Sequence, residues 1–181
     1  MINIKEHKVA FDKNVIDRFE QQNGFKLPNE YVEFLKEYNG GRPEANIVKL
    51  KECEFDSCLI SSFFGVNRDD NNHILYQFNI LKKRIPGECI PIADVEGGNV
   101  ICLNLSADRN GYIYLWDHEV ELVYGEKITI DNMCFVAKSF TEFLKMIERY
   151  NPQNEDLSDY KTLEVYVNPD FLKKIRKEQG T

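Results

Sequence analysis

Three short apolar runs in the middle of the chain, joined by turn-forming residues, place the tightest constraint on its fold. Each run is rich in β-branched and aromatic residues, and Gly97–Gly98 and the loop SADRNG separate them. Such runs predict strands, and three strands joined by turns predict a meander in an antiparallel sheet. The runs are CIPIADV (89–95), NVICLNL (99–105) and YIYLWDH (112–118).

The register of the last hairpin in this meander has two readings. A two-residue turn at Asn110–Gly111 sets Trp116 opposite Leu105. A longer loop instead aligns Ile101 with Leu115. We favour the longer loop, because the three residues ADR before this turn make a poor strand.

Helical periodicity predicts four helices within the first 150 residues. Asn14 is a suitable N-cap for the first helix, and Gly24 supplies its left-handed stop. Pro28 suits the first position of the second helix, which Asn39–Gly41 end. The predicted helices lie at about 14–23, 28–38, 74–81 and 139–150, with further strands within 44–50, 54–66 and 127–137.

The helix predicted at 139–150 and the segment after it complete the chain. Ser139 and Glu142 have the spacing of a capping box, in which each side chain accepts from the other's backbone N–H. A final helix opens at Asn168–Pro169 and carries Phe171 on an apolar face surrounded by Lys and Arg. This helix either docks onto the domain or forms a partner or dimer contact, and we favour docking.

The length and pattern together predict an α+β fold with one domain. A chain of 181 residues falls within the usual range for one domain. We expect residues 1–150, with a core at about 13–150, to form an antiparallel-rich sheet of about five or six strands with helices packed around it. Residues 151–181 are expected to form a C-terminal extension whose short helix docks on that domain.

The net charge and the hydropathy of the chain indicate what class of partner it binds and in which cellular compartment we expect it. The net charge is −7, which argues against a nucleic-acid binder because such proteins depend on cationic contacts to phosphates. The same charge suits a partner with a basic surface. The opening residues contain no continuous apolar region of a signal peptide, and no apolar run approaches the roughly 20 residues of a membrane span. We therefore expect a cytoplasmic protein.

Five cysteines are present, and none of them is paired at the two-residue spacing of a zinc or redox motif. Most have apolar neighbours, so we interpret them as buried free thiols. No metal or other cofactor is expected.

Asp117, His118 and Glu119, which end the last apolar run, are chemically capable of acid–base work. Side chains alternate across a strand, so Asp117 and His118 point to opposite faces and cannot pair directly as a catalytic dyad. The sequence also lacks a Gly-x-Ser-x-Gly elbow and a phosphate-binding loop. We expect no catalytic residues: a carboxylate here ends the strand by accepting backbone N–H groups. Trp116 is expected in the core or at the edge of a groove, with a partner for its indole N–H, and we favour the core.

The order of these features resembles the SUKH superfamily, which includes the fungal cell-wall assembly regulators. The resemblance covers about residues 13–150, and residues 151–181 lie outside it. The matching features are Leu27–Pro28 with Tyr31 and Phe34, the stop at Asn39–Gly41, the turn at Gly97–Gly98, and Trp116 with the two residues after it.

The resemblance implies a bacterial immunity protein that binds and neutralises a cognate toxin domain, a nuclease being one candidate, without enzymatic activity. We expect a protein partner, with no direct nucleic-acid or membrane contact, and a monomer or weak dimer. The alternative is a non-enzymatic regulator or scaffold that binds endogenous proteins. Each candidate contact residue is also explained singly by a turn or a solvated surface. The candidates are Asp69, Asp70, Asp94, Glu96, Asp117 and Glu119.

Overall fold

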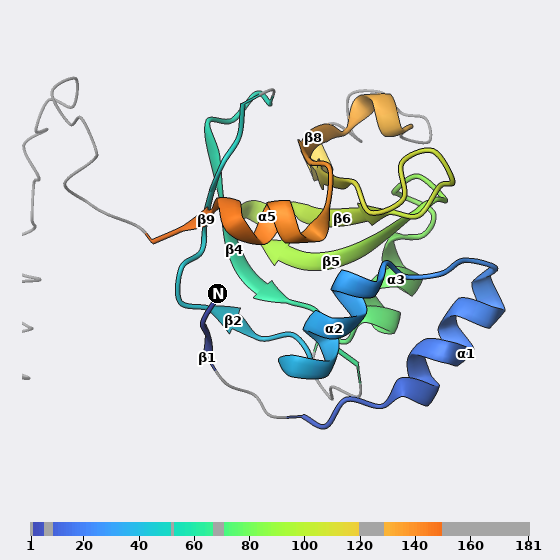
Figure 1. Ribbon diagram of the computed structural model, residues 1–181. Helices are drawn as coiled ribbons and strands as arrows, with labels where there is room; N and C mark the ends of the chain where they lie inside the picture. The colour runs from blue at the N-terminus through green and yellow to red at the C-terminus, as the bar shows by residue number, and fades with distance from the viewer. Residues whose placement is uncertain (1, 6–8, 52, 67–70, 120–128, 150–181) are drawn as a thin grey trace, which may run out of the picture. The chain divides into compact units, whose positions relative to one another are not determined.

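The three central apolar runs fold as neighbouring antiparallel strands, β5 (Cys89–Val95), β6 (Val100–Asn104) and β7 (Ile113–Trp116). Ile101 pairs with Leu115, so the longer-loop register is confirmed. Figure 1 shows the computed structural model, which describes residues 2–5, 9–51, 53–66, 71–119 and 129–149. The predicted docking of a C-terminal helix and the candidates Asp69 and Asp70 lie outside the described residues.

The α+β class is confirmed, and the described residues place seven strands in the main sheet rather than five or six. Their order is β8-β7-β6-β5-β4-β3-β9, and every neighbouring pair is antiparallel. The prediction missed β9 because this two-residue strand follows directly on a helix and has no strand pattern of its own. The other strands are β3 (Ile47–Lys49), β4 (Ser57–Phe63), β8 (Cys134–Ala137) and β9 (Ile147–Glu148), with a separate pair β1 (Ile4–Lys5) and β2 (Arg42–Pro43).

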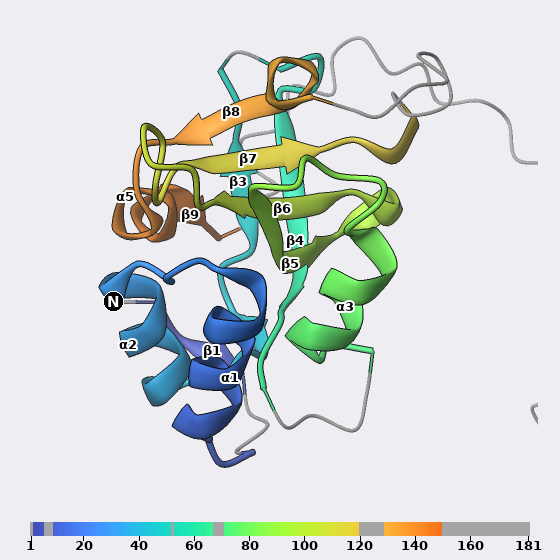
Figure 2. The same cartoon turned by 90° about the vertical axis from the view of Figure 1, so that its right-hand side faces the viewer.

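Bulges bend the sheet. The register shifts between Ile60 and Ser62 in β4 and between Pro91 and Ala93 in β5. A bulge increases local twist, and Figure 2 shows β3 and β4 running steeply across the direction of β5, β6, β7 and β8. Helices α1, α2 and α3 lie below β5 in this view, while α5 lies at the left, beside β9.

The helices lie close to where periodicity predicts them, with small differences at their starts, but the helix predicted to run to residue 150 ends at Met146. Asp12 caps the first helix in place of Asn14, because its carboxylate accepts the Asn14 N–H at 2.9 Å. Gly24 ends that helix at a φ of +74°, as predicted. Pro28 is the residue before the second helix rather than its first residue. The helices are α1 (Lys13–Asn23), α2 (Asn29–Glu37), α3 (Ile74–Leu81) and α5 (Phe140–Met146), and no helix among the described residues is long and apolar enough to cross a membrane.

Aromatic side chains join α2 and α5 to the sheet. Phe34 of α2 lies 4.9 Å from Phe63 of β4 and 5.0 Å from Phe140 of α5, measured between ring centroids. All three are almost completely buried. Tilted and edge-to-face pairs at this separation contribute about 0.5–1.5 kcal/mol each beyond the area that they bury. The two helices and β4 therefore share one aromatic core.

The residue that ends α2 also fixes the helix to the end of β4. Asn39 is buried at a φ of +50°, and its amide Nδ2 donates to the carbonyl oxygens of Val9 at 3.0 Å and Val66 at 2.8 Å. Its Oδ1 accepts the Val66 N–H at 2.8 Å. The backbones approach so closely that a Cβ on Gly65 would lie 2.0 Å from the Asn39 carbonyl oxygen. Only glycine fits at position 65.

Helix α5 begins on a carboxylate that belongs to α2. Glu30 accepts the backbone N–H groups of Phe140 at 2.6 Å and Thr141 at 3.2 Å. The predicted capping box is half correct: Ser139 accepts the Glu142 N–H at 3.0 Å, but the Glu142 carboxylate accepts from Lys138 rather than from Ser139. The first N–H groups of a helix have no acceptor within the helix, and Glu30 supplies one for α5.

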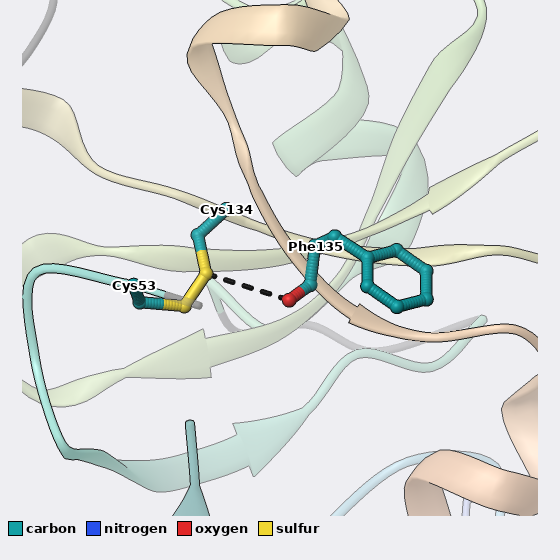
Figure 3. Close-up of a disulfide and its surroundings, with 3 residues drawn as sticks. All are labelled: Cys53, Cys134 and Phe135. Carbon is teal, nitrogen blue, oxygen red and sulfur yellow. Dashed lines mark hydrogen bonds between the residues drawn. A yellow bond between two sulfur atoms is a disulfide. The ribbon is translucent and has the colours of Figure 1, made fainter. Parts of the chain in front are cut away.

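The expectation of free thiols is wrong for two of the cysteines. Cys53, which follows β3, forms a disulfide with Cys134 at the start of β8, and the two Cα atoms are 5.4 Å apart (Figure 3). The remaining thiols, Cys58, Cys89 and Cys102, are free and buried. Burial raises the pKa of Cys58 to about 11 and that of Cys89 to about 12, so both stay protonated and unreactive.

The disulfide closes a large loop, because its cysteines are 81 residues apart in sequence. In the chain-entropy account, a loop of this size restricts the unfolded chain by up to about 4.5 kcal/mol. Reducing the bond should therefore lower the free energy of unfolding, measured with urea, by up to that amount. Cys53→Ser should show the lower value with or without reductant. Equal stability of the oxidised and reduced wild type, or five alkylatable thiols before reduction, would contradict the assignment.

Candidate functional site

Four of the six predicted contact residues meet at one end of the sheet. Asp94 pairs with Val100 across β5 and β6, and Val100 pairs with Trp116 across β6 and β7. The residues that follow β5 and β7 therefore leave the sheet at the same end, on the right in Figure 2. We call this group the acidic edge: Asp94, Glu96, Asp117 and Glu119.

Asp94 is one of two partly buried members of the acidic edge, together with Asp117. Its side chain is half-buried in β5, and burial raises the pKa of its carboxyl group, while a hydrogen bond with Ser61 acts in the opposite direction. A carboxylate whose charge is disfavoured by its surroundings is a common mark of a binding site, because a cationic partner stabilises the charged form.

Glu96 and Glu119 are the exposed members of the acidic edge. Glu96 begins the short 3-10 turn η1 (Glu96–Gly98), where Gly97 and Gly98 have φ of +85° and +89°. Glu119 lies in helical backbone just after β7, and Asp117 accepts its N–H at 2.9 Å, which confirms that a carboxylate ends this strand through a backbone N–H. The η1 turn and the Asp117 hydrogen bond hold these two carboxylates beside the end of the sheet.

His118 belongs to a structural contact rather than to a catalytic pair. Its Nδ1 lies 2.9 Å from Oδ1 of Asn99, and the same oxygen accepts its backbone N–H at 3.2 Å. The distance from Nδ1 to the Asp117 carboxylate is 4.0 Å, which is too long for a hydrogen bond. His118 therefore ties the end of β7 to the turn before β6.

Trp116 is buried as predicted, with 2% of its surface exposed. The guanidinium of Arg84 stacks over its ring at 4.9 Å, which is a cation–π contact. The prediction of a partner for its indole N–H is wrong, because no atom of the described residues accepts a hydrogen bond from it. No cluster of three or more His, Cys, Asp or Glu able to hold a metal ion occurs among the described residues.

A second feature, which the sequence did not indicate, is a groove of about 630 Å³ between α2 and α5. We call it the α2–α5 groove. Its floor is apolar, and its rim carries four glutamates against two basic residues, so it combines burial with a net negative charge. Glu33 and Glu37, one helical turn apart on α2, were the only available signal. The lining residues used below are Phe34, Tyr38, Leu144 and Ile147 on the floor, and Glu30, Glu33, Glu37, Glu44, Lys145 and Arg149 on the rim.

Comparison with known proteins gives one family and one curated relative. The sequence model of the SMI1 / KNR4 family (SUKH-1) matches residues 10–146. The SPbeta prophage-derived uncharacterized protein YokK of Bacillus subtilis (strain 168) is 29% identical over 189 residues. That alignment covers 94% of this chain and 88% of the relative, so the similarity to YokK reaches past the segment that the family model matches.

The acidic edge yields a test based on pH. Because the pKa of Asp94 is raised in the folded protein, its ionisation costs stability at neutral pH, and this cost vanishes once pH falls below the unfolded value of 3.8. Asp94→Asn should therefore raise the thermal unfolding temperature at neutral pH, with a difference that shrinks as the pH is lowered through the folded pKa. Glu96→Gln, which is exposed, is the matched control. A lower unfolding temperature for Asp94→Asn at neutral pH would contradict this account.

Proposed function

The chain belongs to the SMI1 / KNR4 family (SUKH-1), and from this membership we propose that it is an immunity protein that binds and neutralises a cognate bacterial toxin domain. SUKH proteins are generally immunity proteins rather than enzymes. The prophage origin of the relative in Bacillus subtilis is compatible with a role in competition between bacteria.

The observation that carries this proposal is the acidic edge. Its carboxylates stand on strand ends and tight turns instead of on a long loop, so little conformational freedom is lost when a partner binds. The partly buried Asp94 gains a favourable environment when a cation approaches it. A complementary basic surface would bury roughly 800 Å² on each partner in an interface of standard size.

The proposed toxin class is a nuclease. A nuclease cleft is basic because it must bind phosphates, and a row of fixed carboxylates occupies such a cleft as a mimic of the nucleic-acid backbone. Neutralisation then needs no bond to be made or broken, and no cofactor. The role proposed for this chain is that of a cytoplasmic inhibitor that acts as a monomer or weak dimer.

The proposal predicts a kinetic effect of charge reversal at the acidic edge. Glu96→Lys together with Glu119→Lys should slow association with a cognate toxin domain, because long-range attraction between unlike charges speeds encounter. The slowing should be greatest at low salt, where screening is weakest. Stopped-flow fluorescence over a series of salt concentrations measures this effect.

Glu88→Lys is the matched control, because Glu88 is an exposed glutamate before the first residue of β5, at the opposite end of that strand from Glu96. It should leave the association rate nearly unchanged. If Glu88→Lys slows association as much as the double reversal does, net charge alone accounts for the effect. The acidic edge would then not be the contact surface.

A further inference from the structure

Beyond the toxin contact at the acidic edge, we propose that the α2–α5 groove binds a cationic amphipathic helix of a partner protein. The two surfaces occupy opposite ends of β7. The acidic edge follows Trp116 at the end of this strand. Ile113, at its start, pairs with Ala137, two residues before the Ser139 cap of α5.

The floor of the groove leaves apolar area available to a ligand. Tyr38, Leu144 and Ile147 are only partly buried, although each packs against the core. Phe34 lies among them and is 4% exposed. Burying the remaining apolar surface contributes about 25 cal/mol per Å² to binding before the costs of association are subtracted. Leu and Phe side chains are the groups that gain most from this floor.

Several charges on the rim are already used within the domain. Glu30 accepts the N–H groups at the start of α5. Glu44 pairs with Arg149 at 2.8 Å, which leaves this pair neutral. Glu33 pairs with Lys36 at 2.6 Å, but both side chains are exposed, so the pair contributes little and yields readily to a competing cation.

Glu37 is placed against the electrostatic preference of its own helix. It is the last residue of α2, where the helix dipole is negative and favours a cation. The pKa of Tyr38 is raised, mainly by burial and to a smaller extent by the neighbouring carboxylate of Glu37. The tyrosine therefore stays neutral beside this carboxylate. A residue that destabilises its helix and faces an open groove is well placed to receive a cation from outside.

These features select one chemical class of ligand. Glu33 and Glu37 are spaced one helical turn apart, which matches Lys or Arg residues at the same spacing on a second helix. The apolar floor beside them matches the apolar stripe of that helix, as in other helix-in-groove contacts. An acidic or purely apolar helix satisfies only one of the two requirements.

The test uses the full-length protein and a synthetic amphipathic helical peptide of leucine and lysine. The comparison peptide carries glutamate at every lysine position. The lysine peptide should bind, and NMR shift changes should concentrate at Leu144 and Ile147. Glu33→Lys together with Glu37→Lys should weaken binding by about tenfold or more. Glu88→Lys, which makes a charge change of the same sign at a residue that does not line the groove, should leave the affinity unchanged.

Glu37→Lys alone separates binding from folding. It should raise the thermal unfolding temperature, since a cation suits the end of α2, while it weakens peptide binding. Equal weakening by Glu88→Lys would overturn the proposal in favour of non-specific attraction. Shift changes at the groove residues on dilution, without any response to the peptide, would overturn the proposal in favour of a second copy of the chain. The same changes on removal of residues 151–181, again without a response to the peptide, would overturn it in favour of this chain's own C-terminal segment. Neither outcome depends on toxin protection.

Discussion

The fold depends on a close backbone contact between the end of α2 and the end of β4. The Asn39 amide makes three hydrogen bonds to the backbone of two distant segments, and Gly65 permits an approach that no side chain would allow. This contact sets where α2 lies on the sheet. Because α2 then presents Glu30 to the first N–H groups of α5, the second helix is positioned from the first. The groove between these helices is a consequence of the same contact.

Sequence patterns predicted the parts of the fold that local chemistry decides. Strand β5 matches its apolar run from end to end, and the hairpin register followed from the poor strand propensity of its loop. Features that join distant segments were not predictable in this way. Glu30 caps a helix 110 residues away, and Cys53 bonds a cysteine 81 residues away; neither spacing carries a local signal. The strand β9 was missed for a related reason, since its partner β3 decides its conformation.

The candidate site likewise has a part that local sequence patterns predicted and a part that depends on contacts between distant segments. The order of strands and turns was enough to suggest carboxylates at strand ends, and the antiparallel register brings four of them to one edge. The α2–α5 groove needs α5, β9 and the segment after β2 to meet α2, which no pattern in one segment specifies. The polar residues that looked chemically active are used to build the edge. His118 holds Asn99, and Asp117 holds the backbone of Glu119.

We propose that the protein acts by binding alone, through an electronegative surface on a rigid sheet. The most direct measurement is the growth of cells that co-express the toxin domain with His118→Ala, scored beside co-purification of the two proteins. Full protection together with retained co-purification is the predicted result, because the backbone N–H at position 118 still donates to Asn99 after the imidazole is removed. Loss of protection while the variant still binds the toxin as tightly as the wild type would contradict the account, since His118 would then take part in chemistry.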